Sequence, residues 1–166
     1  MQAGKSVDAY ACVPAHCCQQ SVADQAYAQA WSTGTETWIA LPREAWPPAW
    51  FYEDGSPMYD QPAVQLWRAL SGHPDAGTFW EQHCDADIVK IFGFEPAESW
   101  PSCYYHSTWQ LLLTVYVDGF KMSGPETYRD VAWTALHTYI EIGEPAEANV
   151  VYSMQTYFLI SRPRTS

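Results

Sequence analysis

One dipeptide, Asp118-Gly119, constrains the fold more than any other feature of this sequence. It lies between two stretches rich in β-forming residues, 109–117 and 120–122. An Asp-Gly pair in this setting favours a two-residue hairpin turn, because both residues of such a turn need positive φ. The sequence therefore predicts an antiparallel hairpin with its tip at Asp118-Gly119.

Two helices are predicted on either side of this hairpin. After a turn over 72–75, the apolar residues Trp80, Cys84 and Ile88 recur at helical spacing, and Gly93 follows where a C-terminal cap residue belongs. A second helix is predicted over 126–142, with Gly143 after it. We expect both helices to pack on the strands.

The remaining segments complete an α+β pattern. Ser21 is a candidate N-cap for a short helix over 21–30, and the many prolines of residues 42–62 predict a loop. Further strands are predicted over 38–41, 103–106 and 150–160. The order of helices and strands is typical of an α+β fold with a mixed or antiparallel sheet.

The charge and composition exclude some classes of protein. The 166 residues carry 8 Lys+Arg against 19 Asp+Glu, a net charge of −11, and 48% of them are hydrophobic. The length suits one domain, or a piece of a larger protein, and the composition is too apolar for a disordered chain. The negative charge disfavours a free-standing nucleic-acid binder, because phosphate binding depends mainly on Lys and Arg.

The sequence predicts an intracellular chain. Its longest apolar run, 111–117, is far shorter than the roughly 18 residues that a membrane span needs. Residues 1–8 contain no apolar signal core, so we expect neither secretion nor a membrane anchor. The five cysteines are an odd number without the spacing of a disulfide framework, which favours a reducing compartment.

Nine tryptophans and eleven tyrosines are the most unusual part of the composition. Aromatic rings in such numbers normally fill cores and interfaces, so some of them should be buried against a neighbour. A protein partner is therefore one expectation. The acidic balance fits a basic protein better than a nucleic acid.

Residues 1–20 show no clear period and are predicted to form a poorly ordered leader, and 161–166 a tail. Two groups of residues could hold zinc if the fold gathered them. They are Cys12, His16, Cys17 and Cys18, and His83, Cys84, Cys103 and His106. Neither group has the spacing of a zinc finger, so ordinary thiols and unliganded imidazoles are the favoured interpretation.

The segment over 111–119, LLLTVYVDG, resembles the catalytic hairpin of reverse transcriptases of the Ty1/copia retrotransposon class. In that family an apolar strand is followed by Tyr-Val-Asp-Asp and then by a second apolar strand that leads to a glycine. Here Phe120 to Gly124 follow the hairpin.

Other segments resemble the same family in the same order. They are Ala26 to Gln29, Thr37 to Pro42, Ala69 to Gly72 with Trp80 after it, and Gly93-Phe94 followed by Ser102 to Tyr104. The resemblance covers about residues 21–160. It implies a reverse-transcriptase palm-like sheet, with most of the fingers and all of the thumb, connection and ribonuclease H parts missing.

The resemblance implies an RNA-directed DNA polymerase, in which two Mg²⁺ ions about 4 Å apart clamp the attacking and leaving oxygens. Three aspartates hold these ions in the family. Only Asp118 matches them, as the candidate catalytic residue and metal ligand, because the other two positions are Val22 and Gly119. Asp24 is a candidate replacement for the aspartate missing at Val22, because two residues along a strand return to the same face.

These departures predict a degenerate fragment of a retrotransposon polyprotein without polymerase activity. Nucleic acid would be its partner by resemblance, but the charge disfavours it. The alternative is a non-catalytic interaction module or complex subunit that reuses the palm fold through its Trp- and Tyr-rich surface. Two further interpretations stay open: an active enzyme in which Asp24 and Asp118 suffice, and a plain hairpin turn at Asp118 that binds no metal.

Overall fold

The computed structural model describes residues 2–98 and 100–148. In chain order its elements are α1 (Gln2–Ala11), β1 (His16–Val22), α2 (Ala26–Gln29), β2 (Trp38–Ala40), the 3-10 helices η1 (Arg43–Ala45) and η2 (Pro48–Trp50), β3 (Ala63–Gln65), α3 (Ala76–Phe92), β4 (Glu95–Pro96), β5 (Cys103–His106), β6 (Leu111–Tyr116), β7 (Gly119–Pro125), α4 (Glu126–Tyr139) and β8 (Ala146–Glu147). The predicted strand over 150–160 and the tail over 161–166 lie outside the described residues.

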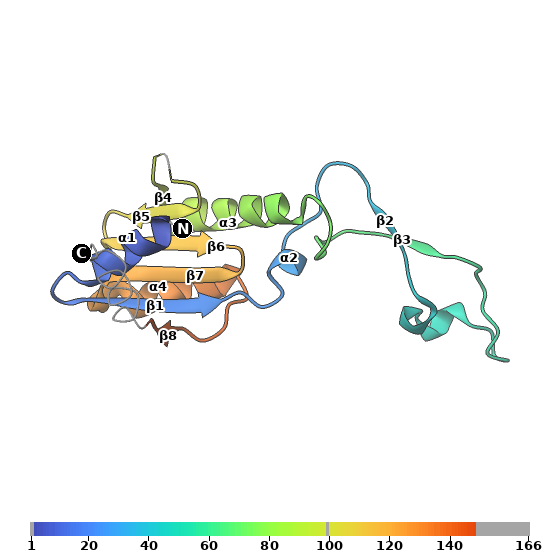
Figure 1. The fold of residues 1–166 in the computed structure, drawn as a ribbon. Helices are drawn as coiled ribbons and strands as arrows, with labels where there is room; N and C mark the ends of the chain where they lie inside the picture. The colour runs from blue at the N-terminus through green and yellow to red at the C-terminus, as the bar shows by residue number, and fades with distance from the viewer. Residues whose placement is uncertain (1, 99, 149–166) are drawn as a thin grey trace, which may run out of the picture.

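A six-stranded antiparallel sheet forms the body of the protein, in the order β4-β5-β6-β7-β1-β8 (Figure 1). The predicted α+β fold is confirmed, and the sheet is antiparallel throughout its described pairs. Helices α3 and α4 pack together on one face. Helix α1 lies against β1, β6 and β7. Within the described ranges, no helix has the length and apolar character needed to cross a membrane.

The core lies between the sheet and the pair α3 and α4. Leu113 and Met122 are neighbours in the β6–β7 ladder, as are Val115 and Phe120, and all four are buried. From the helices, the buried side chains of Trp80, Cys84, Ile88, Trp133 and Leu136 join the same cluster. The helical spacing predicted for α3 is confirmed, and Gly93 caps it with a left-handed φ of 74°.

The predicted hairpin is confirmed, but its tip is one residue earlier than predicted. Tyr116 pairs with Gly119, so the turn residues are Val117 and Asp118, and Gly119 begins β7. This register places Val115 directly beside Phe120 in the core. Packing of the apolar pairs therefore decides the position of the tip, over the turn preference of Asp-Gly.

The N-terminal segment differs most from its prediction. The expected poorly ordered leader over 1–20 holds α1 and most of β1, which lies inside the sheet between β7 and β8. The sequence pattern does not predict strand β1, because its buried positions include the polar residues Gln19 and Ser21. Their side chains donate hydrogen bonds to Glu147 and to the Gly143 carbonyl. Because β1 extends to Val22, the helix predicted over 21–30 is reduced to α2.

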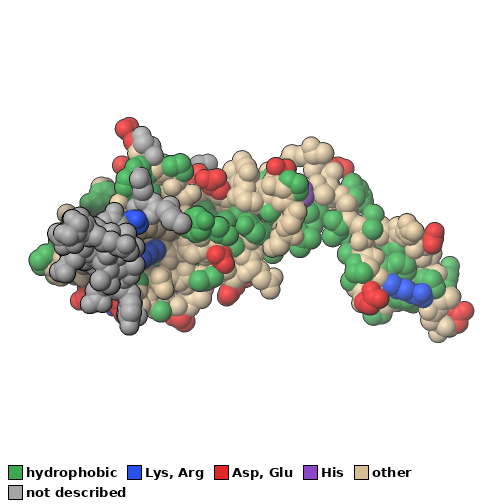
Figure 2. All heavy atoms as spheres, viewed as in Figure 1, with side chains coloured by type: hydrophobic (Ala, Val, Ile, Leu, Met, Phe, Trp, Pro, Cys, Tyr) green, Lys and Arg blue, Asp and Glu red, His purple; other side chains and the backbone are tan. Residues whose placement is uncertain are grey.

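An arm of residues 31–68 leaves the body between α2 and α3 and carries β2 and β3 at its centre (Figure 1). The strand predicted over 38–41 is confirmed as β2, and the proline-rich stretch over 42–62 forms turns and two short 3-10 helices. No side chain from 31 to 68 is buried. Hydrophobic side chains therefore cover much of the arm's surface (Figure 2).

Gly124 is the glycine of β7 that the fold most needs. Its φ is +148°, and a Cβ atom there would lie 2.5 Å from the Gln110 carbonyl oxygen and 2.8 Å from Leu111 Cδ2. We expect Gly124→Ala to lower the free energy of unfolding by about 2–3 kcal/mol, because the backbone must move to admit the methyl group. Urea denaturation measures the change.

Gly119→Ala is the matched control in the same strand. The φ of Gly119 is not positive, and an added Cβ would lie 3.3 Å from the nearest atom, the Tyr116 carbonyl oxygen. We expect its free energy of unfolding to stay within about 1 kcal/mol of the parent chain. Equal losses in the two variants would contradict the close approach at Gly124.

Candidate functional site at the Asp118 hairpin

The hairpin tip is held by hydrogen bonds from two other elements. The indole N–H of the buried Trp80 in α3 donates to the Val117 carbonyl. The Ala23 N–H, just after β1, donates to the Asp118 carbonyl over 2.8 Å. Both turn carbonyls are thus occupied, which fixes the backbone while the Asp118 side chain stays exposed.

Val117 adopts a backbone conformation that its side chain disfavours. Its φ is 54°, in the left-handed region, although it is β-branched. This conformation costs an L-residue about 1–2 kcal/mol. Because Val117 is 47% exposed, burial of its side chain offsets little of that cost. The strain therefore persists because Trp80, Ala23 and the β6–β7 register hold the turn.

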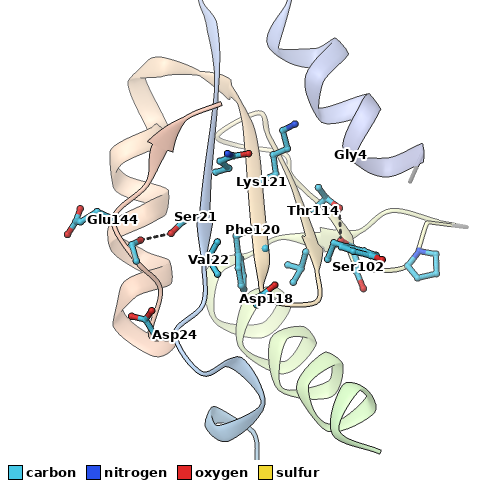
Figure 3. A pocket seen from close by; sticks show the side chains of 16 residues that line it. Gly4, Ser21, Val22, Asp24, Ser102, Thr114, Asp118, Phe120, Lys121 and Glu144 are labelled. Atoms are coloured by element: carbon cyan, nitrogen blue, oxygen red, sulfur yellow. Dashed lines mark hydrogen bonds between the residues drawn. The ribbon is translucent and has the colours of Figure 1, made fainter. Parts of the chain in front are cut away.

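An open cavity of about 890 Å³ lies beside the tip, over the ends of β1, β6 and β7 (Figure 3). Among the described residues, the charged side chains in its wall are those of Asp24, Asp118, Glu144 and Lys121. The Lys121 ammonium pairs with Asp8 of α1, with 2.5 Å between Nζ and Oδ1. Its charge is thus compensated, and the cavity wall is acidic.

The sheet brings together the three positions to which the resemblance assigns aspartates. Val22 and Gly119 are directly opposed in the β1–β7 ladder. Asp118 is adjacent to Gly119 and receives the hydrogen bond from Ala23, the residue after Val22. The strand ends thus converge at one point, and Asp118 supplies the single carboxylate at these positions.

Asp24 does not lie on the strand as expected. Strand β1 ends at Val22, and the chain turns through Gln25, whose φ is 48°. The Asp24 backbone N–H donates to the Glu141 carbonyl over 2.9 Å, away from β7. The same-face argument for Asp24 is therefore wrong, although Asp24 and Asp118 line the same cavity.

These residues do not fit a pair of Mg²⁺ ions. Two divalent cations in close contact need several carboxylates to neutralise and fix them. Within residues 2–98 and 100–148, no three His, Cys, Asp or Glu side chains gather where they could hold a metal ion. Val22 offers only an alkyl group at the strand end, and Gly119 has no side chain.

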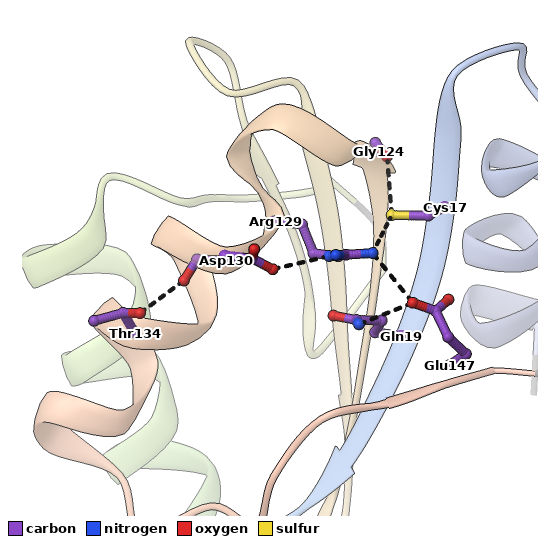
Figure 4. A network of polar contacts seen from close by, with 7 residues as sticks. All are labelled: Cys17, Gln19, Gly124, Arg129, Asp130, Thr134 and Glu147. Carbon is purple, nitrogen blue, oxygen red and sulfur yellow. Dashed lines mark hydrogen bonds and ion pairs between the residues drawn. The ribbon is translucent and has the colours of Figure 1, made fainter.

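The first group of candidate zinc ligands does not gather either. Cys17 and Cys18 are neighbours on β1 and so point to opposite faces of the sheet, while Cys12 is exposed after α1. The Cys17 thiol lies in a polar network with Arg129, Gln19 and Glu147, which ties α4 to β1 and β8 (Figure 4). Burial raises the pKa of both thiols, that of Cys18 to about 11, so they are protonated at neutral pH.

The second group is also divided among other contacts. His83 Nδ1 lies 3.5 Å from the Asp87 carboxylate. The His106 ring stacks on Trp109, with 4.1 Å between ring centroids. Cys84 and Cys103 are buried thiols whose pKa is raised by desolvation. Within the described residues, the fold therefore does not gather these four side chains at one point.

Sequence reasoning missed two features of the site. The pair of Lys121 with Asp8 joins β7 to α1, which was expected to be a leader. The strain at Val117 follows from the shifted tip. The available signal for the pair of Lys121 with Asp8 was the alternation of apolar residues through Met122. This alternation puts Lys121 on the face of the sheet opposite the core.

Replacing Val117 by glycine should stabilise the protein. Glycine adopts a φ of 54° without a Cβ clash, so we expect Val117→Gly to raise the free energy of unfolding by about 0.5–1 kcal/mol after the entropy cost of glycine. Thermal and urea denaturation measure the effect. Val131→Gly is the control: Val131 is similarly exposed, at 52%, but lies in α4, so the same change should destabilise by up to about 1 kcal/mol. Destabilisation in both variants would show that Val117 is not strained.

Comparisons of this chain with models of protein families, with curated proteins and with solved structures find no match. The geometry around Asp118 and the motif resemblance are therefore the basis for an interpretation of function.

Proposed function

We propose that this chain is a palm-like domain of the Ty1/copia reverse-transcriptase type, derived from a retrotransposon polyprotein, that does not polymerise. The observation that carries the proposal is the opposition of Val22 and Gly119 beside Asp118. The motif positions of the sequence meet in space, as a common site requires, but two of the three lack a carboxylate.

The chemistry of phosphoryl transfer explains why these two positions matter. Both metal ions must be held while charge develops on the attacking and leaving oxygens. Asp118 alone offers one negative charge against the four positive charges of two Mg²⁺ ions. Its side chain is also solvent-exposed, where water competes for the cation.

The electrostatics of the cavity also argue against a bound template and primer. Nucleic-acid channels depend on Lys and Arg to neutralise phosphates. The described wall beside Asp118 carries Asp24 and Glu144, and the one cation among its described residues, Lys121, is already paired with Asp8. A backbone of phosphates would be repelled from this surface.

We expect no template-dependent incorporation of nucleotides by this chain in a primer-extension assay with Mg²⁺ or Mn²⁺. The signal should equal that of Asp118→Asn, because one carboxylate cannot hold two ions. Incorporation by the parent chain that Asp118→Asn abolishes would overturn the proposal.

The double variant Val22→Asp, Gly119→Asp tests whether these positions form the ancestral metal site. It should gain Mn²⁺ binding that calorimetry detects and the parent chain lacks, because three carboxylates then meet at the strand ends. Thr35→Asp, Ser56→Asp is the matched control, because it adds two carboxylates to the arm, outside the β1–β7 ladder that ends beside Asp118. Equal Mn²⁺ binding by the two double variants would contradict a site at Val22 and Gly119.

A second candidate function is an interaction module or complex subunit. The observation that favours it is the arm of residues 31–68, in which several aromatic side chains are exposed and none is buried. Exposed apolar surface of this kind marks sites of protein association.

We expect the chain, purified from its native source, to travel in a stoichiometric assembly, as size-exclusion chromatography with mass analysis can measure. Acrylamide quenching of tryptophan fluorescence should be weaker in the assembly than in the isolated chain, because a partner covers the rings. A monomer from the native source would contradict the module, all the more if most of its tryptophans are inaccessible to the quencher.

A further inference from the structure

We infer that the arm, residues 31–68, is a docking surface for an Arg- or Lys-rich segment of a protein partner. The exposed aromatic rings and carboxylates of the arm would bind the cationic side chains together. This inference rests on the interaction module proposed above, and it names the part of the chain and the chemistry that would recognise the partner.

Several aromatic rings of the arm remain exposed. The centre of the arm is a two-stranded ribbon in which Trp38 pairs with Gln65 and Ala40 with Ala63, and no further strand of the described residues joins it. Trp38 is 58% exposed and Trp67 is 66% exposed. A two-stranded hairpin by itself is marginally stable in water, so rings in this number need a covering partner.

The distal part of the arm is nevertheless ordered by contacts among its own rings. Trp46 lies against Trp50 and Phe51 with centroid separations of 6.1 and 6.0 Å, and Trp50 meets Tyr59 edge to face at 5.6 Å. The Trp46 indole N–H donates to the Leu41 carbonyl over 2.9 Å. The surface is thus preorganised, which reduces the entropy that binding would cost.

The negative charge of the arm favours a cationic partner. It carries five exposed carboxylates against two arginines, and their residues are Glu36, Glu44, Glu53, Asp54 and Asp60 against Arg43 and Arg68. None of these carboxylates has an ion-pair partner in the described part of the chain. Acidic side chains lie among the hydrophobic ones on the arm in Figure 2. A cationic partner would neutralise them.

The base of the arm already contains one example of the proposed contact. The Arg68 guanidinium lies over the Trp31 ring, 3.8 Å from its centroid, and donates to the Gln29 carbonyl. A cation over an indole face is attracted by the ring quadrupole, and Trp is the strongest of the aromatic side chains in this respect. Trp38 and Trp67 offer similar faces that the chain leaves in solvent.

The same observations disfavour the other occupants. Single-stranded nucleic acids stack on aromatic rings, but they also need a basic groove, and this arm is acidic. A second copy would bring the same acidic arm and a chain charge of −11, so like charges would face one another. An Arg- or Lys-rich segment satisfies both the rings and the carboxylates.

Titration of the full chain with synthetic peptides tests the inference. The probes are peptides of equal length that alternate Arg with Ala, Lys with Ala, or Glu with Ala, and tryptophan fluorescence and calorimetry report binding. We expect the Arg peptide to bind best, the Lys peptide less well and the Glu peptide not at all. Affinity should fall as the salt concentration rises.

Two variants separate the contribution of the rings from that of the charges. Trp38→Ala, Trp67→Ala should weaken binding of the Arg peptide by about tenfold, and Glu53→Gln, Asp60→Asn should weaken it less and reduce its salt dependence. Trp100→Ala is the control, because Trp100 is exposed on the body at 38% and should leave binding unchanged. All these side chains are exposed, so circular dichroism should show an unchanged fold.

The remaining outcomes overturn the inference in distinguishable ways. Equal binding by the parent chain and the Trp38→Ala, Trp67→Ala variant would show that the rings are not the docking surface. Binding of a single-stranded oligonucleotide in place of the Arg peptide, or self-association that the same variant abolishes, would show the wrong occupant. If no peptide binds but the native chain is isolated in a stoichiometric assembly, the partner chemistry is wrong and the interaction module still stands.

Discussion

The antiparallel pairing of β1 with β7 joins the two parts of the chain on which the candidate site depends. It runs from His16 opposite Pro125 to Val22 opposite Gly119, and β8 attaches to the sheet only through β1 among the described strands. The end of this ladder delivers the Ala23 N–H to the carbonyl of Asp118. Without the pairing, the hairpin tip would lose one of its two anchors and the cavity one of its walls.

The residues at the end of that ladder make the pairing stable without a metal ion. Three carboxylates within a few ångströms would repel one another, and a bound cation would have to offset that repulsion. Val22 and Gly119 carry no charge, so Asp118 meets no like charge at its nearest neighbours in the ladder. Under the proposed relation to the polymerase family, the two positions that lack a carboxylate are thus also positions at which folding needs no cation.

Periodic apolar residues made most of the sheet and both long helices predictable. The spacing of Trp80, Cys84 and Ile88 located α3, and the runs around Asp118 located β6 and β7. Strand β1 was not predictable in this way, because its buried residues Gln19 and Ser21 are polar. The hydrogen bonds that compensate for their burial form only in the folded chain. The tip residue and the strain at Val117 were missed for a related reason, since the pairing of Val115 with Phe120 decides the register.

For the site, local propensity misplaced the end of β1. Ser21 as an N-cap predicted a helix, whereas Ser21 and Val22 are the last two residues of the strand. Asp24 shows the limit of reasoning from strand spacing. Its position two residues after Val22 implied a shared face, but the left-handed turn at Gln25 ends the strand before that rule applies.

The apolar side chains of the body bury one another, whereas several of those of the arm are exposed. Folding therefore uses the apolar surface of the body, and binding would use that of the arm. The core between the sheet, α3 and α4 is closed by residues of the body, including Phe120, Trp133 and Leu136. The arm is joined to that body through a short ladder, in which Ala69 N–H donates to the Ala30 carbonyl and Trp31 bridges Arg68. A partner that covers the arm would therefore bury new surface without rearranging the core. The Asp118 hairpin, pinned by Trp80 and Ala23 from the body, would keep its geometry whether or not the arm is occupied.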